Sequence, residues 1–138
     1  MNSNDFMKFI LRSPLHGLMS GSTMLITVTG RKTGRAITTP VNYYRVGDSL
    51  WVITTRDRTW WRNVKDGAPV KLYLRGREVD GFAEAILDEW LVAAQVADYL
   101  RHLPVSARYM DVRMEDGVPN AEDLERVARE RLMIRIKV

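Results

Sequence analysis

The sequence contains no cysteine and only two histidines, His16 and His102. Without cysteine the chain can form no disulfide framework, thiolate metal site or thiol nucleophile. Two histidines with no evident third ligand are a poor basis for zinc binding, so we expect no metal site. A chain that needs no disulfides suits a reducing compartment, and we expect a cytoplasmic protein.

Long apolar runs are also missing. No segment approaches the roughly 18 consecutive apolar residues that span a membrane as a helix. Asp5, Lys8 and Arg12 interrupt the apolar positions of residues 1–20, unlike the unbroken apolar run of a secretion signal. We therefore expect no transmembrane segment. Residues 1–18 suit a short helix, which leaves open a peripheral contact with a membrane surface.

The length of 138 residues and the 46% hydrophobic composition suit one core, so we expect a single domain over residues 1–138. Six short segments are rich in β-branched and aromatic residues and are separated by glycine or aspartate turns, a pattern typical of strands. The predicted strands are residues 23–29, 36–46, 49–55, 69–75, 78–87 and 131–137.

Three helices are predicted among these strands. Residues 59–66 form a short one that is capped by Thr59 and ended by Gly67. Another begins at Asn120. The third covers residues 89–103, and helical spacing predicts an inward face made of Trp90, Ala93, Ala94, Ala97 and Leu100. Short, even antiparallel strands with few helices are more economically closed into a small barrel than left open with long edges.

Positive charge is concentrated in the middle of the chain. Residues 31–77 contain eleven Lys or Arg against three Asp, whereas the rest of the chain has an acidic excess. The asymmetry indicates an anionic partner, which could be a phosphorylated cofactor, a nucleic acid or an acidic membrane surface. A solvated basic face without a partner would give the same pattern.

Part of this charge lies in a turn between two predicted strands, where residues 30–35 read GRKTGR. Glycine freedom, exposed N–H groups, a hydroxyl group and three cations together suit phosphate or carboxylate oxygens. The spacing matches neither the Walker loop nor the dinucleotide-binding fingerprint. The turn therefore favours an anion other than ATP or NAD.

Three further motifs follow this turn in order: TTP at 38–40, ITTR at 53–56 and WWRNV at 60–64. The set resembles the deazaflavin (F420)-dependent nitroreductase and quinone reductase family, of the split-barrel group that includes pyridoxamine phosphate oxidase-like flavoproteins. The resemblance covers residues 13–77 well, and the final strand, 131–137, more loosely. It implies a mainly β fold with helices, a six-stranded antiparallel split β-barrel of the FMN-binding type.

The resemblance also implies a function. Its family transfers hydride from the reduced cofactor F420H2 to quinones, nitroaromatics or activated double bonds, so we expect an F420-dependent oxidoreductase with a small-molecule acceptor. Split barrels commonly pair, which predicts a homodimer. The deazaflavin cofactor carries a phosphate and an oligoglutamate tail, which would account for the basic middle segment.

Carried over position by position, the resemblance assigns roles to individual residues. The assigned cofactor contacts are Arg31, Lys32 and Thr33 at the phosphate, Pro40 and Val41 at the ring, Thr54, Thr55 and Arg56 beside the ring and tail, and Trp60 and Asn63 over the cofactor. Arg58 would add charge at the pocket mouth. Thr55 and Tyr109 are the candidate catalytic residues, because either could hydrogen-bond the acceptor oxygen as negative charge develops.

One segment departs from the family pattern. Only residues 57–59 separate the ITTR strand end from Trp60, where typical members carry a longer loop. A loop of this length cannot form a lid, so we expect an open pocket mouth. The alternatives are an FMN-dependent reductase or a non-catalytic carrier of a fatty acid, haem or similar amphiphile.

Aromatic residues bear on a last alternative, a nucleic-acid surface on which Tyr43, Tyr44, Trp60 and Trp61 would stack bases. Prolines and tight turns interrupt any continuous basic track, so we expect no nucleic-acid partner.

Adjacent tryptophans cannot both point inward on one helix face, which predicts that one of the pair lines a pocket. Trp51 and Trp90 have core spacing and are expected to pack inside.

Overall fold

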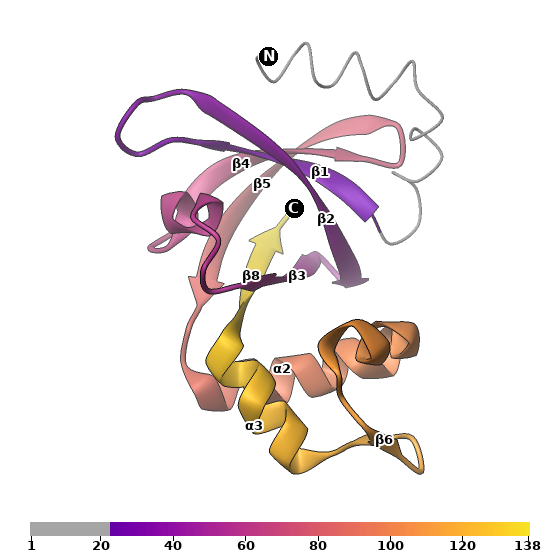
Figure 1. Cartoon of the computed structure of the whole chain (residues 1–138). Coiled ribbons are helices and arrows are strands. Elements are labelled where there is room, and N and C mark those ends of the chain that lie inside the picture. Colours follow the sequence, from indigo (N-terminus) through magenta and orange to yellow (C-terminus); the bar gives the residue numbers. More distant parts are fainter. Residues whose placement is uncertain (1–22) are drawn as a thin grey trace.

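Six antiparallel strands close into a barrel in the order β1-β2-β3-β8-β5-β4 (Figure 1). The structure is a computed structural model that describes residues 23–138. The barrel strands are β1 (Thr23–Thr29), β2 (Ala36–Val46), β3 (Ser49–Thr55), β4 (Ala68–Leu74), β5 (Arg77–Ile86) and β8 (Arg131–Lys137). The predicted fold class is confirmed. The predicted helix at residues 1–18 lies outside the described residues.

The strand boundaries agree with the sequence pattern except around one turn. β4 and β5 each lie one residue earlier than the predicted 69–75 and 78–87. Arg75 and Gly76 both adopt positive φ, 50° and 80°, and form the turn between the two strands. The left-handed backbone at Arg75 ends β4 at Leu74, which the residue pattern alone does not reveal.

The inside of the barrel holds one hydrophobic core. Met24, Ile26 and Val28 on β1 alternate with outward-facing residues and meet the inward residues of the other strands. A 3₁₀ helix, η2 (Trp60–Val64), packs against this core. Trp60 and Trp61 are both only 7% exposed, so the prediction that they cannot both be buried is wrong. A short 3₁₀ turn packed on the barrel buries two adjacent residues because it has no single inward face.

The other expectation for this turn concerned its first residue. The Thr59 side chain makes no cap hydrogen bond, which contradicts the predicted role of Thr59 as a cap. Thr59 has φ −106° and ψ −21°, whereas a capping residue usually has an extended backbone that brings its side-chain oxygen to the N–H groups of the first turn.

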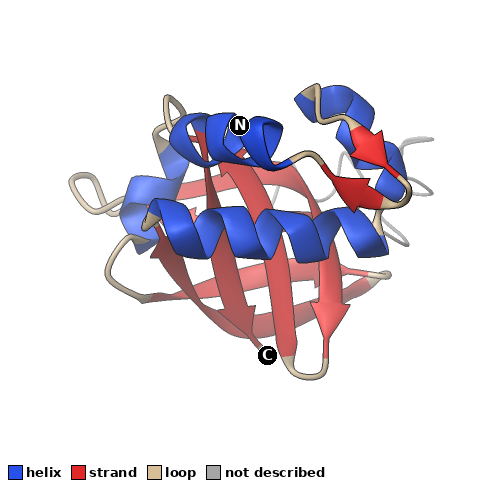
Figure 2. Cartoon of the chain, turned by 90° about the horizontal axis from the view of Figure 1, so that it is seen from below, coloured by secondary structure: helices blue, strands red, loops and turns tan. Residues whose placement is uncertain are grey.

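A helical layer lies across the outer face of the barrel, where it packs on residues of β2, β3, β5 and β8 (Figure 2). Its elements are α2 (Glu89–His102), η3 (Pro104–Met110), α3 (Ala121–Glu130) and a small hairpin of β6 (Met114–Glu115) and β7 (Val118–Pro119). Asp88 caps α2 by accepting hydrogen bonds from the N–H groups of Trp90 and Leu91. Asn120 caps α3 as predicted and accepts from the N–H of Asp123. Neither η3 nor the hairpin was predicted.

The inward face of α2 differs from the prediction except at Leu100, which is buried as predicted. Val92, Val96, Tyr99 and Leu100 are buried, whereas Trp90 is 86% exposed. These residues bury more apolar area against the barrel than the predicted alanine face would, so the helix is rotated toward them. The expectation of a packed tryptophan holds only for Trp51, which packs partly buried against the helical-layer core.

A polar cluster fastens α2 to β2. The Tyr44 hydroxyl donates a hydrogen bond to Asp98 Oδ2 at 2.7 Å and accepts one from Gln95. The Tyr44 ring also stacks on His102, with the ring centroids 4.6 Å apart. Burial and the hydrogen bond to Asp98 raise the pKa of the Tyr44 phenol, so this residue stays neutral and holds the helix in place.

The fold bears on two possible partners, nucleic acid and a membrane. Tyr43, Tyr44, Trp60 and Trp61 are all buried, so they offer no stacking platform for nucleic-acid bases. Within residues 23–138, no helix has the length and apolar content needed to cross a membrane.

Candidate functional site

A cavity of about 290 Å³ lies between the barrel and the helical layer. β2, the end of β3 and the first residue of β8 form its barrel side, and α2 with η3 forms its helical side. The residues that line it are Pro40, Val41, Asn42, Ile53, Thr54, Thr55, Arg58, Trp60, Tyr99, Ser106, Tyr109, Met110 and Arg131. We refer to this cavity as the pocket.

The pocket brings together residues that the sequence assigned to one site from distant segments. The predicted residues in its lining are Pro40, Val41, Thr54, Thr55, Arg58, Trp60 and Tyr109. Both candidate catalytic residues are therefore present, Thr55 at the end of β3 and Tyr109 in η3. Tyr109 is 79% exposed, which places it at the mouth. One of the two adjacent tryptophans, Trp60, lines the pocket, as the prediction required.

Strand pairing places the two threonines. β3 and β8 pair so that Thr54 lies opposite Leu132 and Thr55 opposite Arg131. The chain then turns at residues 57–59, where the Arg58 N–H donates to the Thr55 carbonyl at 3.2 Å. This tight turn leaves the Arg58 side chain exposed at the edge of the pocket.

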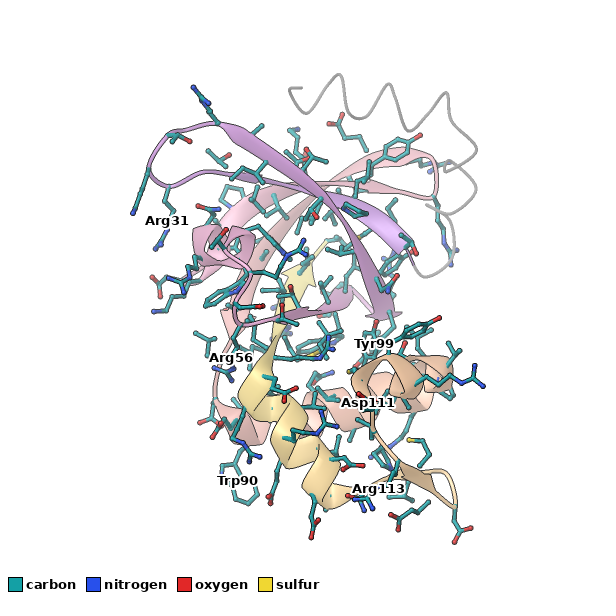
Figure 3. All side chains as sticks on the ribbon, viewed as in Figure 1. Arg31, Arg56, Trp90, Tyr99, Asp111 and Arg113 are labelled. Carbon is teal, nitrogen blue, oxygen red and sulfur yellow. The ribbon has the colours of Figure 1, made fainter. Side chains whose placement is uncertain are left out.

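The basic turn at residues 30–35 lies outside the pocket lining, at the tip of the β1–β2 hairpin (Figure 3). The Gly30 N–H donates to the Arg35 carbonyl at 2.8 Å, and Gly34 takes a φ of 70° that suits glycine. Arg31, Lys32 and Arg35 are exposed and form no ion pair with any residue in the described range. The turn is a preformed cluster of exposed cations.

Asn63 connects the basic turn to the pocket wall. Its Oδ1 accepts a hydrogen bond from the Arg31 N–H at 2.9 Å, and its Nδ2 donates to the Trp60 carbonyl at 3.0 Å. The side chain therefore bridges a residue of the turn and a residue that lines the pocket. These two hydrogen bonds give Asn63 a structural role in addition to its predicted role over the cofactor.

Arg56 is not in the pocket lining. Its guanidinium group donates to the carbonyl groups of Leu87, Ala128 and Arg131 at 2.7, 2.9 and 2.9 Å (Figure 3). Its backbone N–H also donates to the Glu130 carbonyl at 2.9 Å. Arg56 thus ties β3 to the segment before α2 and to the junction of α3 and β8, and these bonds occupy much of the guanidinium that was predicted to contact ring and tail.

Sequence reasoning missed several lining residues. These are Asn42, Ile53, Ser106, Met110 and Arg131. Arg131 could have been found from the pairing of the ITTR strand with the last strand, because Thr55 and Arg131 are cross-strand partners. Ser106 and Met110 lie on the unpredicted η3 and carry no sequence signal of a site.

Tyr99 is a buried phenol in the pocket lining and is only 1% exposed. Burial raises the pKa of this phenol, while Ser106 and the positive charge of Arg131 act in the opposite direction. Tyr99 is therefore a neutral hydrogen-bonding group at physiological pH, held on the inner helical side of the pocket.

A larger cavity of about 550 Å³ lies along β1, β4 and β5. Thr27, Lys71, Tyr73 and Glu78 are among its lining residues, and the exposed ion pair of Lys71 with Asp80 is part of its wall. None of the predicted site residues lines it. The larger cavity is therefore not the one that the sequence predicts as the site.

The groups in the pocket fit a planar aromatic ligand with an anionic arm. Pro40, Val41 and Trp60 provide apolar surface for a ring, while the threonine, tyrosine and serine groups provide hydrogen-bonding partners. The nearby free cations of the basic turn suit phosphate or carboxylate oxygens. No group of three or more His, Asp or Glu side chains within residues 23–138 is arranged to hold a metal ion.

Comparison with known families gives a match to most of the chain. The family model described as F420H(2)-dependent quinone reductase matches residues 13–114, a segment that includes the basic turn and most of the pocket. No curated protein matches the chain.

Solved structures of similar fold have low sequence identity. The flavocytochrome Anf3 from Azotobacter vinelandii matches with a TM-score of 0.54 at 13% identity, over 88% of this chain and 60% of that chain. The FAD and heme binding protein from Mycobacterium smegmatis matches with a TM-score of 0.53 at 16% identity, over 88% of this chain and 62% of that chain. A structure described as a domain-swapped dimer matches with a TM-score of 0.57 at 15% identity, over 97% and 95% of the two chains. These likenesses support the split-barrel fold, and this chain is shorter than the first two proteins.

Proposed function

The chain belongs to the F420H2-dependent quinone reductase family, a family of oxidoreductases, and we propose that it transfers hydride from F420H2 to quinone-like, nitroaromatic or activated double-bond acceptors. The observation that carries the proposal is the joining of the pocket to the basic turn through Asn63. One ligand with a ring and an anionic arm could use both places, and F420 has this shape.

The proposed binding mode divides the cofactor between two environments. Pro40, Val41 and Trp60 bind the ring by apolar contact, and Thr54 with Thr55 offers hydroxyl groups at its edge. Arg31, Lys32 and Thr33 bind the phosphate at the basic turn, and Arg58 at the pocket mouth adds charge for the tail. Arg56 supports this mode indirectly, by fixing the strand end that carries Thr54 and Thr55.

A deazaflavin supplies the hydride itself, so the protein positions the reactants and stabilises developing charge. The acceptor has to lie within about 3.5 Å of the hydride donor for transfer. Thr55 at the strand end and Tyr109 at the mouth are proposed to hydrogen-bond the acceptor oxygen. No side-chain nucleophile is required for this chemistry.

Binding and turnover test the proposal directly. F420 added to the purified protein should quench tryptophan fluorescence, and this quenching should be lost in Trp60→Phe but retained in Trp61→Phe. With F420H2 and the quinone menadione, oxidised F420 should appear at a rate that depends on the protein. Tighter binding of FMN than of F420 would favour the FMN-dependent alternative, and co-purified haem or fatty acid without binding of either cofactor would favour a carrier.

We further propose that the chain is a cytoplasmic homodimer. The dimer is supported by the similarity of its fold to a structure described as a domain-swapped dimer. Sedimentation equilibrium of the purified protein would distinguish a dimer of 15.9 kDa chains from a monomer.

A further inference from the structure

Arg131 presents a positive charge to the pocket. It is the first residue of β8, lies opposite Thr55 in the β3–β8 ladder and is half-buried. Within the part of the chain that the structure describes, its guanidinium group forms no ion pair. The guanidinium group is therefore available to a ligand in the pocket.

The charge balance of the pocket points the same way. The lining contains two arginines, Arg58 and Arg131, and neither Asp nor Glu. Arg58 is exposed at the mouth, where water and salt screen its charge. The half-buried Arg131 acts through a lower effective dielectric, so a negative charge inside the pocket is stabilised more strongly by Arg131 than by Arg58.

Arg56 holds the backbone of Arg131 in position. The Arg56 guanidinium donates to the Arg131 carbonyl at 2.9 Å and to the Ala128 carbonyl one turn earlier, also at 2.9 Å. The third bond, to the Leu87 carbonyl at 2.7 Å, joins this junction to the segment before α2. A cation fixed before the ligand binds stabilises charge without having to reorganise during the reaction.

We propose that Arg131 stabilises the negative charge that develops on the acceptor oxygens during hydride transfer, and that Arg56 is its positioning residue. This inference rests on the proposed function. A hydride brings two electrons and one proton, so a neutral quinone becomes a hydroquinone monoanion. Uptake of one proton then gives the hydroquinone, and this proton balances the one released as F420H2 is oxidised to F420.

The neighbours of Arg131 favour the acceptor over the phosphate of the cofactor as its partner. Exposed cations that suit that phosphate already lie outside the pocket, at the basic turn. Arg131 instead acts on Tyr99, whose phenol pKa its charge lowers against the effect of burial. Its field thus reaches the inner helical side of the pocket, where the phenol of Tyr99 could also hydrogen-bond an acceptor oxygen.

A pair of matched probes tests the charge preference without any cofactor. 2-Hydroxy-1,4-naphthoquinone is a vinylogous acid and is anionic at neutral pH, so it mimics the charged product, whereas 1,4-naphthoquinone is neutral. Arg131→Gln should weaken binding of the anion by about tenfold or more, as for loss of a charge-assisted contact, and leave the neutral probe within about twofold. Arg129→Gln removes the same charge from an exposed site two residues away and should change neither affinity.

Kinetics and cofactor binding separate this proposal from the proposed function. With a neutral quinone, Arg131→Gln should lower kcat by about tenfold or more with little change in KM, because the interaction exists only after charge develops. Its affinity for F420 should stay within about twofold of the wild type. If the wild-type protein fails to bind F420, the proposed function fails, while the naphthoquinone comparison still shows whether Arg131 binds an anion in the pocket.

The role of Arg56 is tested by coupling. Arg56→Gln alone should reduce the affinity for the anionic probe. In the double variant with Arg131→Gln, Arg56→Gln should cause no further loss of that affinity. The losses in thermal stability caused by the two substitutions should add in the double variant. Equal losses for the charged and neutral probes, or a large loss of F420 affinity in Arg131→Gln, would overturn the proposal. If Arg131→Gln does not fold, Arg131→Met keeps the aliphatic stem and supports the same comparison.

Discussion

Arg56 and the cations of the basic turn carry the same charge, but the structure places them in opposite environments. Arg31, Lys32 and Arg35 are exposed at the tip of a hairpin and form no ion pair with any of residues 23–138. Arg56 is half-buried, and its guanidinium group donates three hydrogen bonds to main-chain carbonyl groups. The turn has charge available for a ligand, whereas the charge of Arg56 serves the fold.

The difference teaches that a cation beside a site is not necessarily a ligand-binding residue. Carbonyl groups at the end of a helix carry partial negative charge, and an arginine that reaches them is held there. Arg56 meets the last turn of α3 at Ala128 and the start of β8 at Arg131. Arg58, only two residues later, reaches no such group with its side chain and remains exposed at the pocket.

The largest expected effect compares these two arginines. Arg56→Met should lower the free energy of unfolding by about 3 kcal/mol, because three carbonyl groups lose a charged donor. Arg58→Met should change the free energy of unfolding by less than about 0.5 kcal/mol, as is usual for an exposed residue. Urea unfolding of both variants measures the contrast. Equal stability of the two variants would mean that the hydrogen bonds of Arg56 do not support the fold.

The second prediction concerns the free charge of the basic turn. Lys32→Ala should weaken F420 binding by about 2 kcal/mol, as for the loss of a charge-assisted hydrogen bond to phosphate, and should leave the free energy of unfolding unchanged. Fluorescence titration measures the affinity. Lys137→Ala, at the far end of β8 from Arg131, removes the same charge and should bind F420 like the wild type. Unchanged affinity with a lowered melting temperature in Lys32→Ala would make the turn structural.

A smaller effect is expected where the two regions are joined. Asn63→Ala removes the acceptor for the Arg31 N–H and the donor to the Trp60 carbonyl, and it should cost about 1 kcal/mol of unfolding free energy. F420 affinity should fall too, because the turn is no longer tied to the pocket wall. Asn63→Asp keeps the acceptor for the Arg31 N–H, so it should retain part of the unfolding free energy and part of the F420 affinity. Full F420 affinity in Asn63→Ala would show that the turn needs no such link.

The strands could be predicted from the sequence because short runs of β-branched and aromatic residues between glycine or aspartate turns are a local signal. On β1 this run is buried almost throughout, with Met24, Leu25 and Ile26 all fully buried. The buried face of α2 could not be predicted in this way, because the alanines and Trp90 have the same helical spacing as the face that is buried. Packing against Tyr44 and Met133 in the helical-layer core decides which face is buried, and these residues come from other elements.

The candidate site was predictable where a local motif carries it. Thr54, Thr55 and Trp60 belong to such motifs, and the pocket contains all three. Ser106 and Met110 come from η3, whose position depends on how the chain leaves α2. The task of Arg56 also escaped prediction, since its three acceptors lie 31 to 75 residues away in the sequence.

Equilibrium binding of F420 and FMN at low and high salt tests most directly whether the pocket and the basic turn bind one ligand together. Exposed cations are screened as the Debye length falls from about 10 Å at 0.1 M to about 3 Å at 1 M salt. F420 affinity should therefore drop at least severalfold over this range, and FMN, which lacks the oligoglutamate tail, should bind more weakly than F420 at 0.1 M. Salt-independent F420 binding, or tighter binding of FMN, would contradict the account.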